Sequence, residues 1–406
     1  MRRRGGYLPV LCDTLLMTEG SGLYLAGPAL VKAAIGQEVT DEELGGASMH
    51  ASISGTIDFK EKDDESCLER LRGLLAKYGL RELDDKYFVV HRVRATRLAA
   101  KDASEIYDAF TDKPGAQYDV KQVIACLVDA RMEPPAQAGG SEPASAPTQP
   151  PGSRRGLHQQ PDFDEYKADF GQSLVCGYAT IGGHACGIVA NQKKLVQRIM
   201  PGGKTGPTKA VQMPGVIYDD SADKAARFIM DCNQRKIPTV FLHDTTGFMV
   251  GRDSEQGGII RAGAKMVNAM SNCVVPKIVV ITGGSYGAGN YAMCGRAFDQ
   301  FMAFAWPSAK CAVMGANQAT GVLTTIEEAS RKRKGETIDP EAHEKIYAAI
   351  HAAYTQQTAI THAAARGWVD RMIEPHKTRD ELIAALSAAN QGWDYSREFK
   401  TGVLQT

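Results

Sequence analysis

The sequence has no excess of charge of either sign. Lys plus Arg and Asp plus Glu each number 47 among 406 residues, so the formal net charge is zero. Proteins that bind nucleic acid or an anionic membrane through surface charge carry a basic excess. We therefore expect neither kind of partner, whereas a neutral chain is compatible with self-association.

Several local patterns are missing as well. No stretch approaches the ~20 consecutive apolar residues of a membrane-spanning helix. The nine cysteines include no C-x-x-C pair, which favours free buried thiols over a disulfide framework. No H-x-x-x-H pair or His/Cys cluster occurs, so we expect no metal site. The basic start MRRRGGYLPVL has a short apolar stretch broken by Pro9, which argues against a signal peptide.

The length and composition predict two domains joined by a linker. A chain of 406 residues exceeds one ordinary core, since domains hold roughly 100–200 residues each. Residues 1–130 are mixed α/β in pattern, and residues 161–406 form a second, apolar-rich α/β region. Residues 131–160 are rich in Pro, Ala and Gly and have almost no large apolar side chains, so we expect a disordered linker.

In the first region, the apolar segment 22–27 predicts a short buried strand. A helix should begin at Pro28 and end at Gly36, and Thr40 with Glu43 makes a capping box. Leucines at helical spacing predict a further helix over residues 63–80.

The second region alternates strands and helices. Residues 174–183 and 185–192 predict a hairpin, and residues 221–236 a helix with Ser221 as N-cap. Further elements follow in chain order: strand 237–244, helix 257–272, strand 275–284, a helix from Gly287, strands 301–306 and 310–315, and mostly helix from residue 317. Units of strand, helix and strand at this spacing imply parallel crossovers.

One glycine-rich turn stands out, TGGSYGAGNYAMCGRA, after the buried strand. Gly287 would open a helix there, and its free N–H groups would face whatever lies beyond the strand end. Such main-chain donors can stabilise negative charge on a carbonyl oxygen. Tight packing is the plain alternative, while a dinucleotide site is disfavoured because the full G-x-G-x-x-G is absent. Ser285 has no evident base in the sequence, so a turn role is favoured over a nucleophile.

A second turn, HDTTGFMVGRDSEQGG, also lies between a strand and a helix. Gly247 frees the backbone, and Phe248 and Met249 could offer an apolar wall. We interpret the acids of this segment, Asp244 among them, as caps and solvated turn residues. The segment PGGKTGPTKA lacks the order of a phosphate-binding loop and is interpreted as a surface loop.

These two turns together resemble the carboxyltransferase (beta) subunits of biotin-dependent acyl-CoA carboxylases. SADKAARFIMDCNQRKIPTVFLHDTTGFMVGRDSEQGGIIRAGAKMVNA, VPKIVVITGGSYGAGNYAMCGRA and AWPSAKCAVMG are similar to their C-terminal domain, and GLYLAGPALVKAAIGQEVTDEELGG to the later part of their N-terminal domain. The phrases PALVKAAIG, TTGFMVG and GSYGAGNYAMCGRA resemble the methylcrotonyl-CoA branch. The resemblance covers most of the chain outside 131–160, with the first part of the N-terminal domain missing.

The resemblance implies crotonase-like domains built of ββα spiral turns. Residues 1–130 would be a partial N-terminal domain on the acyl-CoA side, and residues 161–406 the C-terminal domain on the biotin side. In the family, carboxybiotin decomposes to CO2 and a biotin enolate, whose ring nitrogen takes a proton from the acyl-CoA. The resulting acyl-CoA enolate attacks the CO2, so both enolates need oxyanion holes. Partners would be a biotin-carrying biotin carboxylase (alpha) subunit and further copies of the chain, paired at the active site and assembled as a hexamer.

Residue by residue, Gly287 and Ala288 would donate their N–H groups on the biotin side. The biotin pocket would hold Gly247, Phe248, Met249, Ser285 and Tyr286. For the acyl-CoA oxyanion hole, alignment on Tyr7 places Gly5 and Gly6 on the second glycine and the alanine of the family's Gly-Gly-Ala-Tyr turn, with Arg4 on the first glycine. No metal is expected in this subunit.

Two alternatives stay open. One is a catalytically inactive partial copy that serves as an assembly subunit, and the other is a subunit of a biotin-dependent acyl-CoA decarboxylase. The location implied by the resemblance is the cytoplasm in a bacterium or the mitochondrial matrix in a eukaryote.

Overall fold

The computed structural model describes residues 7–77, 98–113, 115–131, 159–203, 206–335 and 339–398. Gly5 and Gly6, proposed from the sequence for the acyl-CoA side, lie outside these residues, and so does most of the predicted linker.

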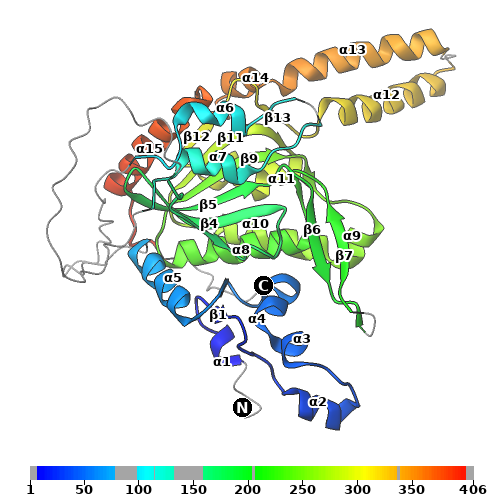
Figure 1. Ribbon diagram of the computed structural model, residues 1–406. Coiled ribbons are helices and arrows are strands. Elements are labelled where there is room, and N and C mark those ends of the chain that lie inside the picture. Colours follow the sequence, from blue (N-terminus) through cyan, green and yellow to red (C-terminus); the bar gives the residue numbers. More distant parts are fainter. Residues whose placement is uncertain are drawn as a thin grey trace.

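An eight-stranded mixed sheet forms the centre of the molecule (Figure 1). Its strand order is β14-β12-β11-β9-β5-β4-β3, and β13 pairs with the far end of β11. The strands from β5 through β9, β11 and β12 to β14 run parallel, as the predicted crossovers require, and β3, β4 and β5 are antiparallel. The bounds are β3 Phe163–Tyr166, β4 Leu174–Ile181, β5 His184–Asn191, β9 Thr239–Thr245, β11 Lys277–Tyr286, β12 Met302–Ala305, β13 Lys310–Ala312 and β14 Arg371–Met372.

Both faces of the sheet are covered, which explains why its central strands are continuous apolar runs. Phe241 and Val279 are register partners and belong to the core beneath α8 (Asp219–Gln234) and α10 (Ile259–Ser271). Their neighbours Val240 and Ile278 point to the opposite core, against α7 (Val120–Leu127) and α15 (Thr378–Gly392). The two-residue alternation of a strand therefore divides one sheet between two cores.

Residues 98–131 pack on the same sheet as the C-terminal part of the chain. Helix α7 lies in one core with β9 and β11, next to the short helix α6 (Ile106–Ala109). The two ends of the predicted linker lie side by side, because the N–H of Arg131 donates to the carbonyl of Gln160 at 2.7 Å. The division of the chain at residue 130 stays a prediction.

The N-terminal residues form a lobe below the sheet (Figure 1). It holds the parallel strands β1 and β2 and a small apolar cluster around Met17. Its elements are α1 Tyr7–Val10, β1 Leu16–Thr18, α2 Pro28–Ile35, α3 Asp41–Gly45, α4 Ala47–Met49, β2 Phe59–Glu61 and α5 Asp64–Lys77. The predicted helix from Pro28 to Gly36 and the Thr40–Glu43 capping box are confirmed.

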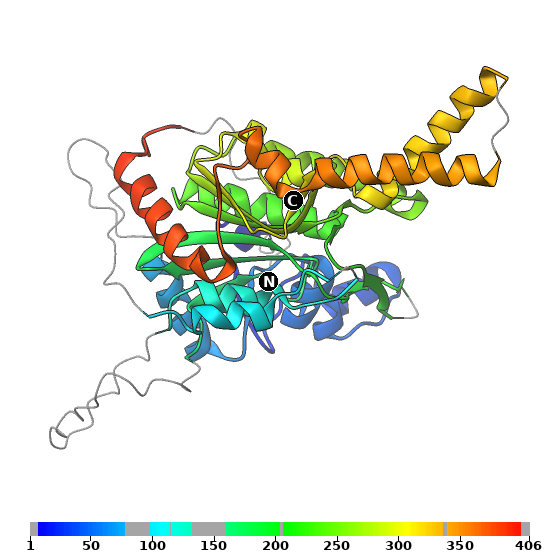
Figure 2. The ribbon, with the colours of Figure 1, turned by 90° about the horizontal axis from the view of Figure 1, so that it is seen from above.

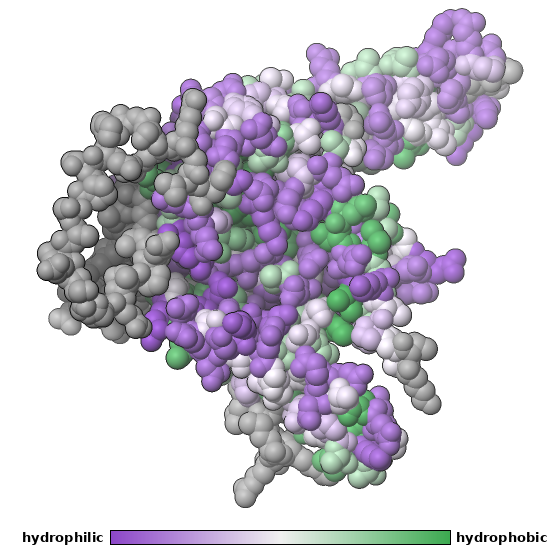
Figure 3. Space-filling model, in the orientation of Figure 1, coloured by the Kyte–Doolittle hydropathy of each residue, from purple (hydrophilic) through white to green (hydrophobic). Residues whose placement is uncertain are grey.

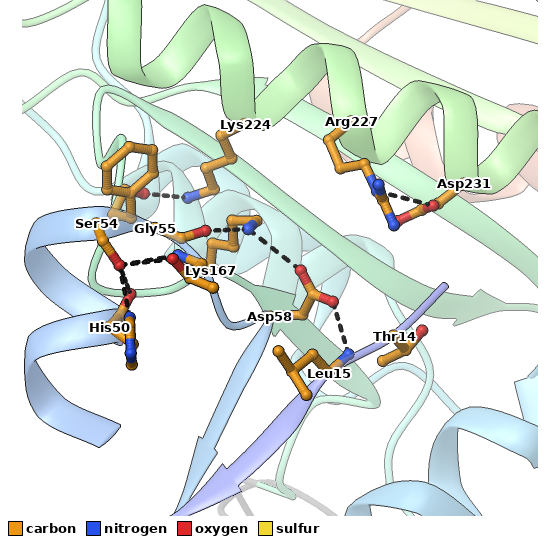
Figure 4. Close-up of polar contacts among 12 residues, drawn as sticks. Thr14, Leu15, His50, Ser54, Gly55, Asp58, Lys167, Lys224, Arg227 and Asp231 are labelled. Atoms are coloured by element: carbon orange, nitrogen blue, oxygen red, sulfur yellow. Dashed lines mark hydrogen bonds and ion pairs between the residues drawn. The ribbon is translucent and has the colours of Figure 1, made fainter. Parts of the chain in front are cut away.

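Buried polar contacts fasten this lobe to the main body, as Figure 4 shows. The carboxylate of Asp58 accepts from the N–H of Leu15 at 2.8 Å and lies 3.3 Å from the ammonium of Lys167. The same ammonium donates to the carbonyl of Gly55. From α8, the guanidinium of Arg227 donates to two carbonyls of the chain just before β1. Lobe and sheet thus share polar groups as well as apolar surface.

Helices α12 (Ala316–Arg333) and α13 (Pro340–Thr358) form an antiparallel arm that projects away from the sheet, seen from above in Figure 2. The short helix α14 (Ile360–Ala365) leads back to the sheet. A β-hairpin of β6 (Val196–Met200) and β7 (Thr208–Gln212) projects from another edge. Residues 208–210, the last three of the segment PGGKTGPTKA that was interpreted as a surface loop, belong to β7. None of the helices in the described ranges is long and apolar enough to cross a membrane.

Two local predictions were wrong. Residues 22–27 form no strand, because the lobe pairs β1 with β2 and the N–H of Leu23 instead bonds the carbonyl of Gly45. Ser221 is not the N-cap of its helix, which begins two residues earlier and has Tyr218 at that position. The Ser221 hydroxyl accepts from the N–H of Tyr218, so it caps in the reverse direction as the third residue of the helix.

Candidate functional site

The first predicted turn forms the junction between β11 and α11 (Gly287–Ala292). Gly287 has a φ of +50°, and a Cβ there would lie 2.7 Å from the carbonyl oxygen of Val313. Glycine is therefore required by both conformation and space. The N–H groups of Gly287 and Ala288 belong to the first helical turn, whose amides have no partner within the helix.

Gly287 and Ala288 border a cavity of about 750 Å³. Its wall includes Ala288, Asn290 and Tyr291 of α11 and Tyr354 of α13, with Trp368 from the chain after α14. Flat aromatic rings and side-chain amides can hold a planar polar ring system, and the volume is within the usual range for small-molecule sites. That the main-chain donors of Gly287 and Ala288 face this space stays a prediction.

A chain of three hydrogen-bonded polar side chains lies beneath the turn: buried His243, buried Ser285 and half-buried Asn290. Asn290 Nδ2 donates to Ser285 Oγ at 2.8 Å, and Ser285 Oγ lies 2.8 Å from His243 Nδ1. His243 Nε2 contacts the carbonyl oxygen of Met293, near the end of α11. Burial lowers the pKa of His243 to about 4, so the imidazole is neutral near pH 7.

Protons on these atoms can be assigned from the partners. A carbonyl oxygen only accepts, so His243 Nε2 carries the hydrogen that faces Met293. The Nδ1 atom is then bare and accepts from the hydroxyl of Ser285, whose oxygen is left to accept from Asn290. The Ser285 hydroxyl thus donates to His243 and accepts from Asn290, whose Nδ2 also faces the Sγ of Cys311 at 4.0 Å.

Ser285 is not placed as a nucleophile. Ser285 and His243 are both fully buried, so an acyl substrate has no access to the hydroxyl. The second nitrogen of the imidazole faces a main-chain carbonyl, whereas a catalytic triad places a carboxylate there. The sequence prediction of a turn role agrees with this placement, although the imidazole partner was missed.

A sequence signal for this partnership existed. Residues 283–287 read GGSYG, which fits the G-x-S-x-G spacing of a serine at a sharp turn from strand to helix. The spacing marks the turn, while the buried surroundings of Ser285 set its role.

Asp244 is buried, and the interpretation of it as a solvated turn residue was wrong. Its carboxylate accepts from the N–H of Gly284 at 2.9 Å, from the hydroxyl of Tyr118 at 2.9 Å and from the ammonium of Lys193 at 2.8 Å. Burial, followed by the charge of Asp244, raises the pKa of the Tyr118 phenol well above its usual value. This network ties the β11 end to the neighbouring strand β9 and to the segment before α7.

The residues predicted for the second turn separate in space. Gly247 lies under α11, because a Cβ on Gly289 would be 2.9 Å from the Cα of Gly247. The ring of Phe248 lies against α10, next to Gly263. Met249 instead borders a second groove of about 810 Å³, between the β6–β7 hairpin and α9 (Arg252–Gly257).

Ser285 and Tyr286 complete the predicted biotin pocket, but neither is part of the described wall of the 750 Å³ cavity. The ring of Tyr286 lies against Gly284, and burial, then the charge of Asp244, raises its pKa. Of the predicted residues, Gly287 and Ala288 border the cavity, and Gly247 and Ser285 support the turn from below. A metal site is not formed by the described residues, which contain no group of three or more potential ligands.

A family model described as "Carboxyl transferase domain" matches residues 4–402. The chain is 37% identical over 415 residues to the probable methylcrotonoyl-CoA carboxylase beta chain of Drosophila melanogaster, covering 99% of this chain and 62% of that protein. It is 38% identical over 392 residues to the corresponding Arabidopsis thaliana chain, covering 95% and 57%. The chain thus spans about three fifths of the length of these curated relatives.

Solved structures agree. The transcarboxylase 12S structure has a TM-score of 0.75 at 30% identity and covers 98% of this chain and 65% of its own. The beta subunit of P. aeruginosa geranyl-CoA carboxylase has a TM-score of 0.55 at 30% identity, with coverages of 99% and 65%. The predicted crotonase-like α/β fold is confirmed by these neighbours. The chain belongs to the carboxyl transferase domain family.

Proposed function

We propose that this chain is the carboxyltransferase part of a biotin-dependent acyl-CoA carboxylase. It would move a carboxyl group from carboxybiotin to an acyl-CoA of the 3-methylcrotonyl type. The observation that carries the proposal is the Gly287–Ala288 turn, whose first-turn amides border a cavity of ligand size. The similarity to methylcrotonoyl-CoA carboxylase beta chains favours the acyl class.

The chemistry needs stabilised negative charge rather than a nucleophilic side chain. An oxygen that gains charge during transfer is stabilised by preorganised N–H donors, and removal of one such donor typically costs about 10²–10³ in rate. Gly287 and Ala288 supply two donors at the start of a helix, where the dipole also favours an anion.

Biotin fits the cavity by chemical type. The described wall combines aromatic rings with the amides of Asn290, Gln300 and Gln357, which can accept and donate to a ureido ring. When bound, carboxybiotin supplies the activated carboxyl group. The chain's own residues would orient the ring through these amides and exclude water with Tyr291 and Trp368.

The acyl-CoA side is proposed to include Gly5 and Gly6 and a second copy of the chain. The exposure of helix α2 supports the second copy, because Lys32 is its one charged residue and none of its apolar residues is buried. Its Ile35 is 72% exposed, and apolar surface also gathers on this lobe in Figure 3. A helix with so few polar residues is normally covered, so we propose that a partner covers it. The transcarboxylase 12S structure is described as a hexamer.

A biotinylated alpha subunit with biotin carboxylase activity is the proposed second partner. The relatives from Drosophila and Arabidopsis are mitochondrial, and a relative in Mycobacterium tuberculosis is a biotin-dependent beta1 subunit. We accordingly propose the mitochondrial matrix in a eukaryote or the cytoplasm in a bacterium.

The test is carboxyl transfer from radiolabelled free carboxybiotin to a panel of acyl-CoAs, followed as acid-stable label. Gly287→Ala should lower the transfer rate by about 100-fold or more, because a side chain there displaces the amides. Gly321→Ala is the matched control, since a Cβ at this position of α12 meets nothing within 4 Å. Both variants are first compared with the parent by circular dichroism.

Label transfer that is equal in the two variants would contradict the role of the turn. If the parent chain transfers no label to any acyl-CoA yet binds the alpha subunit, the assembly alternative is favoured. Release of labelled CO2 from carboxylated acyl-CoA, without carboxylation of any acceptor, would favour the decarboxylase alternative; one relative is a methylmalonyl-CoA decarboxylase subunit.

A further inference from the structure

The hydrogen-bonded side chains beneath the turn come from residues before and after the amides of Gly287 and Ala288. Ser285 lies two residues before Gly287, and Asn290 lies three residues after it, yet the two side chains are bonded at 2.8 Å. His243, from the neighbouring strand β9, contacts Ser285 and also the carbonyl of Met293 beyond the end of α11. The imidazole therefore reaches both the start and the end of this six-residue helix.

The imidazole of His243 is held by the central sheet. His243 is in the middle of the sheet, where its main-chain carbonyl accepts from the hydroxyl of Thr282 at 2.9 Å. It is fully buried, as is Ser285, and a neutral imidazole satisfies both of its partners without a counter-charge. The donor order runs from Asn290 to Ser285 to His243.

We propose that His243 and Ser285, with Asn290 as the link to α11, are positioning residues that aim the amides of Gly287 and Ala288 into the cavity. Neither His243 nor Ser285 touches the cavity, so they act through the turn. This inference rests on the proposed function for its catalytic consequence, while its structural consequence can be measured without any activity.

The structural consequence concerns the amides of α11. The N–H of Met293 bonds the carbonyl of Gly289, and the N–H of Cys294 bonds that of Tyr291. If the buried chain holds the helix, Ser285→Ala should speed hydrogen exchange of residues 291–295 by tenfold or more. Ser173→Ala is the matched control, because Ser173 is equally buried and its hydroxyl bonds Ser221 at 2.8 Å, away from the turn.

The catalytic consequence separates binding from turnover. Donors that act on developing charge affect kcat, so Ser285→Ala should lower kcat about 10- to 100-fold and change KM less than twofold. At His243, Asn places its amide where Nδ1 was and can still accept from Ser285, whereas Gln reaches the position of Nε2 and only keeps Met293. His243→Asn should therefore retain more kcat than His243→Gln.

The outcomes are distinct. Faster exchange confined to residues 291–295 together with a lowered kcat supports the proposal. If Ser285→Ala exchanges faster but the parent chain transfers no carboxyl group, the positioning role is supported and the proposed function alone is overturned. Unchanged exchange in Ser285→Ala, or an equal rise in Ser173→Ala, overturns the positioning role. Should Ser285→Ala fail to fold, the half-buried Asn290→Ala is read by the same exchange criterion.

Discussion

Replacing His243 by asparagine should remove a specific pH dependence of stability. The folded protein keeps this imidazole neutral, because burial lowers its pKa to about 4 from an ordinary value of about 6.5. Between those two pH values the unfolded chain binds a proton that the folded chain does not. Protonation therefore favours unfolding, and stability falls as the pH is lowered through this window.

The size follows from the two pKa values. A shift of this extent corresponds to about 3 kcal/mol once the pH is below both values. At about pH 5 the unfolded histidine is almost fully protonated and the folded one mostly neutral, which gives about 2 kcal/mol. At about pH 8 the term vanishes, so any cost of the substitution there reports lost packing and hydrogen bonds only.

The assay is urea unfolding of the parent chain and His243→Asn at about pH 8 and pH 5. Other groups titrate in both proteins and cancel in the difference between them. The variant should lose about 2 kcal/mol less than the parent between the two conditions. An equal loss in both proteins would show that the folded chain protonates His243 as readily as the unfolded one, and the assignment of a neutral imidazole donating to Met293 would be refuted.

Three further outcomes are expected. Asp129→Asn should destabilise by about 3–5 kcal/mol in urea unfolding, because the buried guanidinium of Arg379, 2.6 Å away, loses its counter-charge. Gly283→Ala should cost about 1–3 kcal/mol by the same measurement, since its Cβ would lie 2.4 Å from a buried carboxylate, whereas Gly257→Ala, with open space around it, should be near neutral. A thiol reagent should label Cys12 first, as the one described cysteine classed as exposed, and Cys12→Ser should lack that fast phase.

Local signals in the sequence were sufficient where an element is defined by its own neighbours. Pro28 at the start of α2 and Gly36 in the left-handed region, with a φ of +68°, set its two ends. Thr40 and Glu43 set the start of α3 in the same way. The apolar segment 22–27 carried no such signal for its partner, and a short apolar run alone does not determine a strand.

The residues of the site also differ in whether their role follows from nearby residues or from distant ones. The turn at Gly287 could be predicted, because a glycine between a buried strand and a helix indicates a tight turn from its sequence neighbours alone. His243 and Asp244 could not, because their partners are 40 or more residues away and are chosen by how β9 pairs with β11. Nothing in a single sequence fixes that register, so a histidine without metal spacing gave no sign of its role.

The pairing of β11 with β9 explains how the two glycines before the turn, Gly283 and Gly284, are related to His243 on the next strand. Ile281 pairs with His243, but Ser285 already pairs with Thr245, so β11 uses two more residues than β9 over the same distance. The extra residues include Gly283, whose missing side chain leaves room for a buried carboxylate. Such a bulge re-aims the side chains that follow it. Ser285 is thereby brought to His243, and Gly287 follows the end of β11 at the cavity. The glycine pair and the histidine together place the turn that we propose directs the main-chain amides.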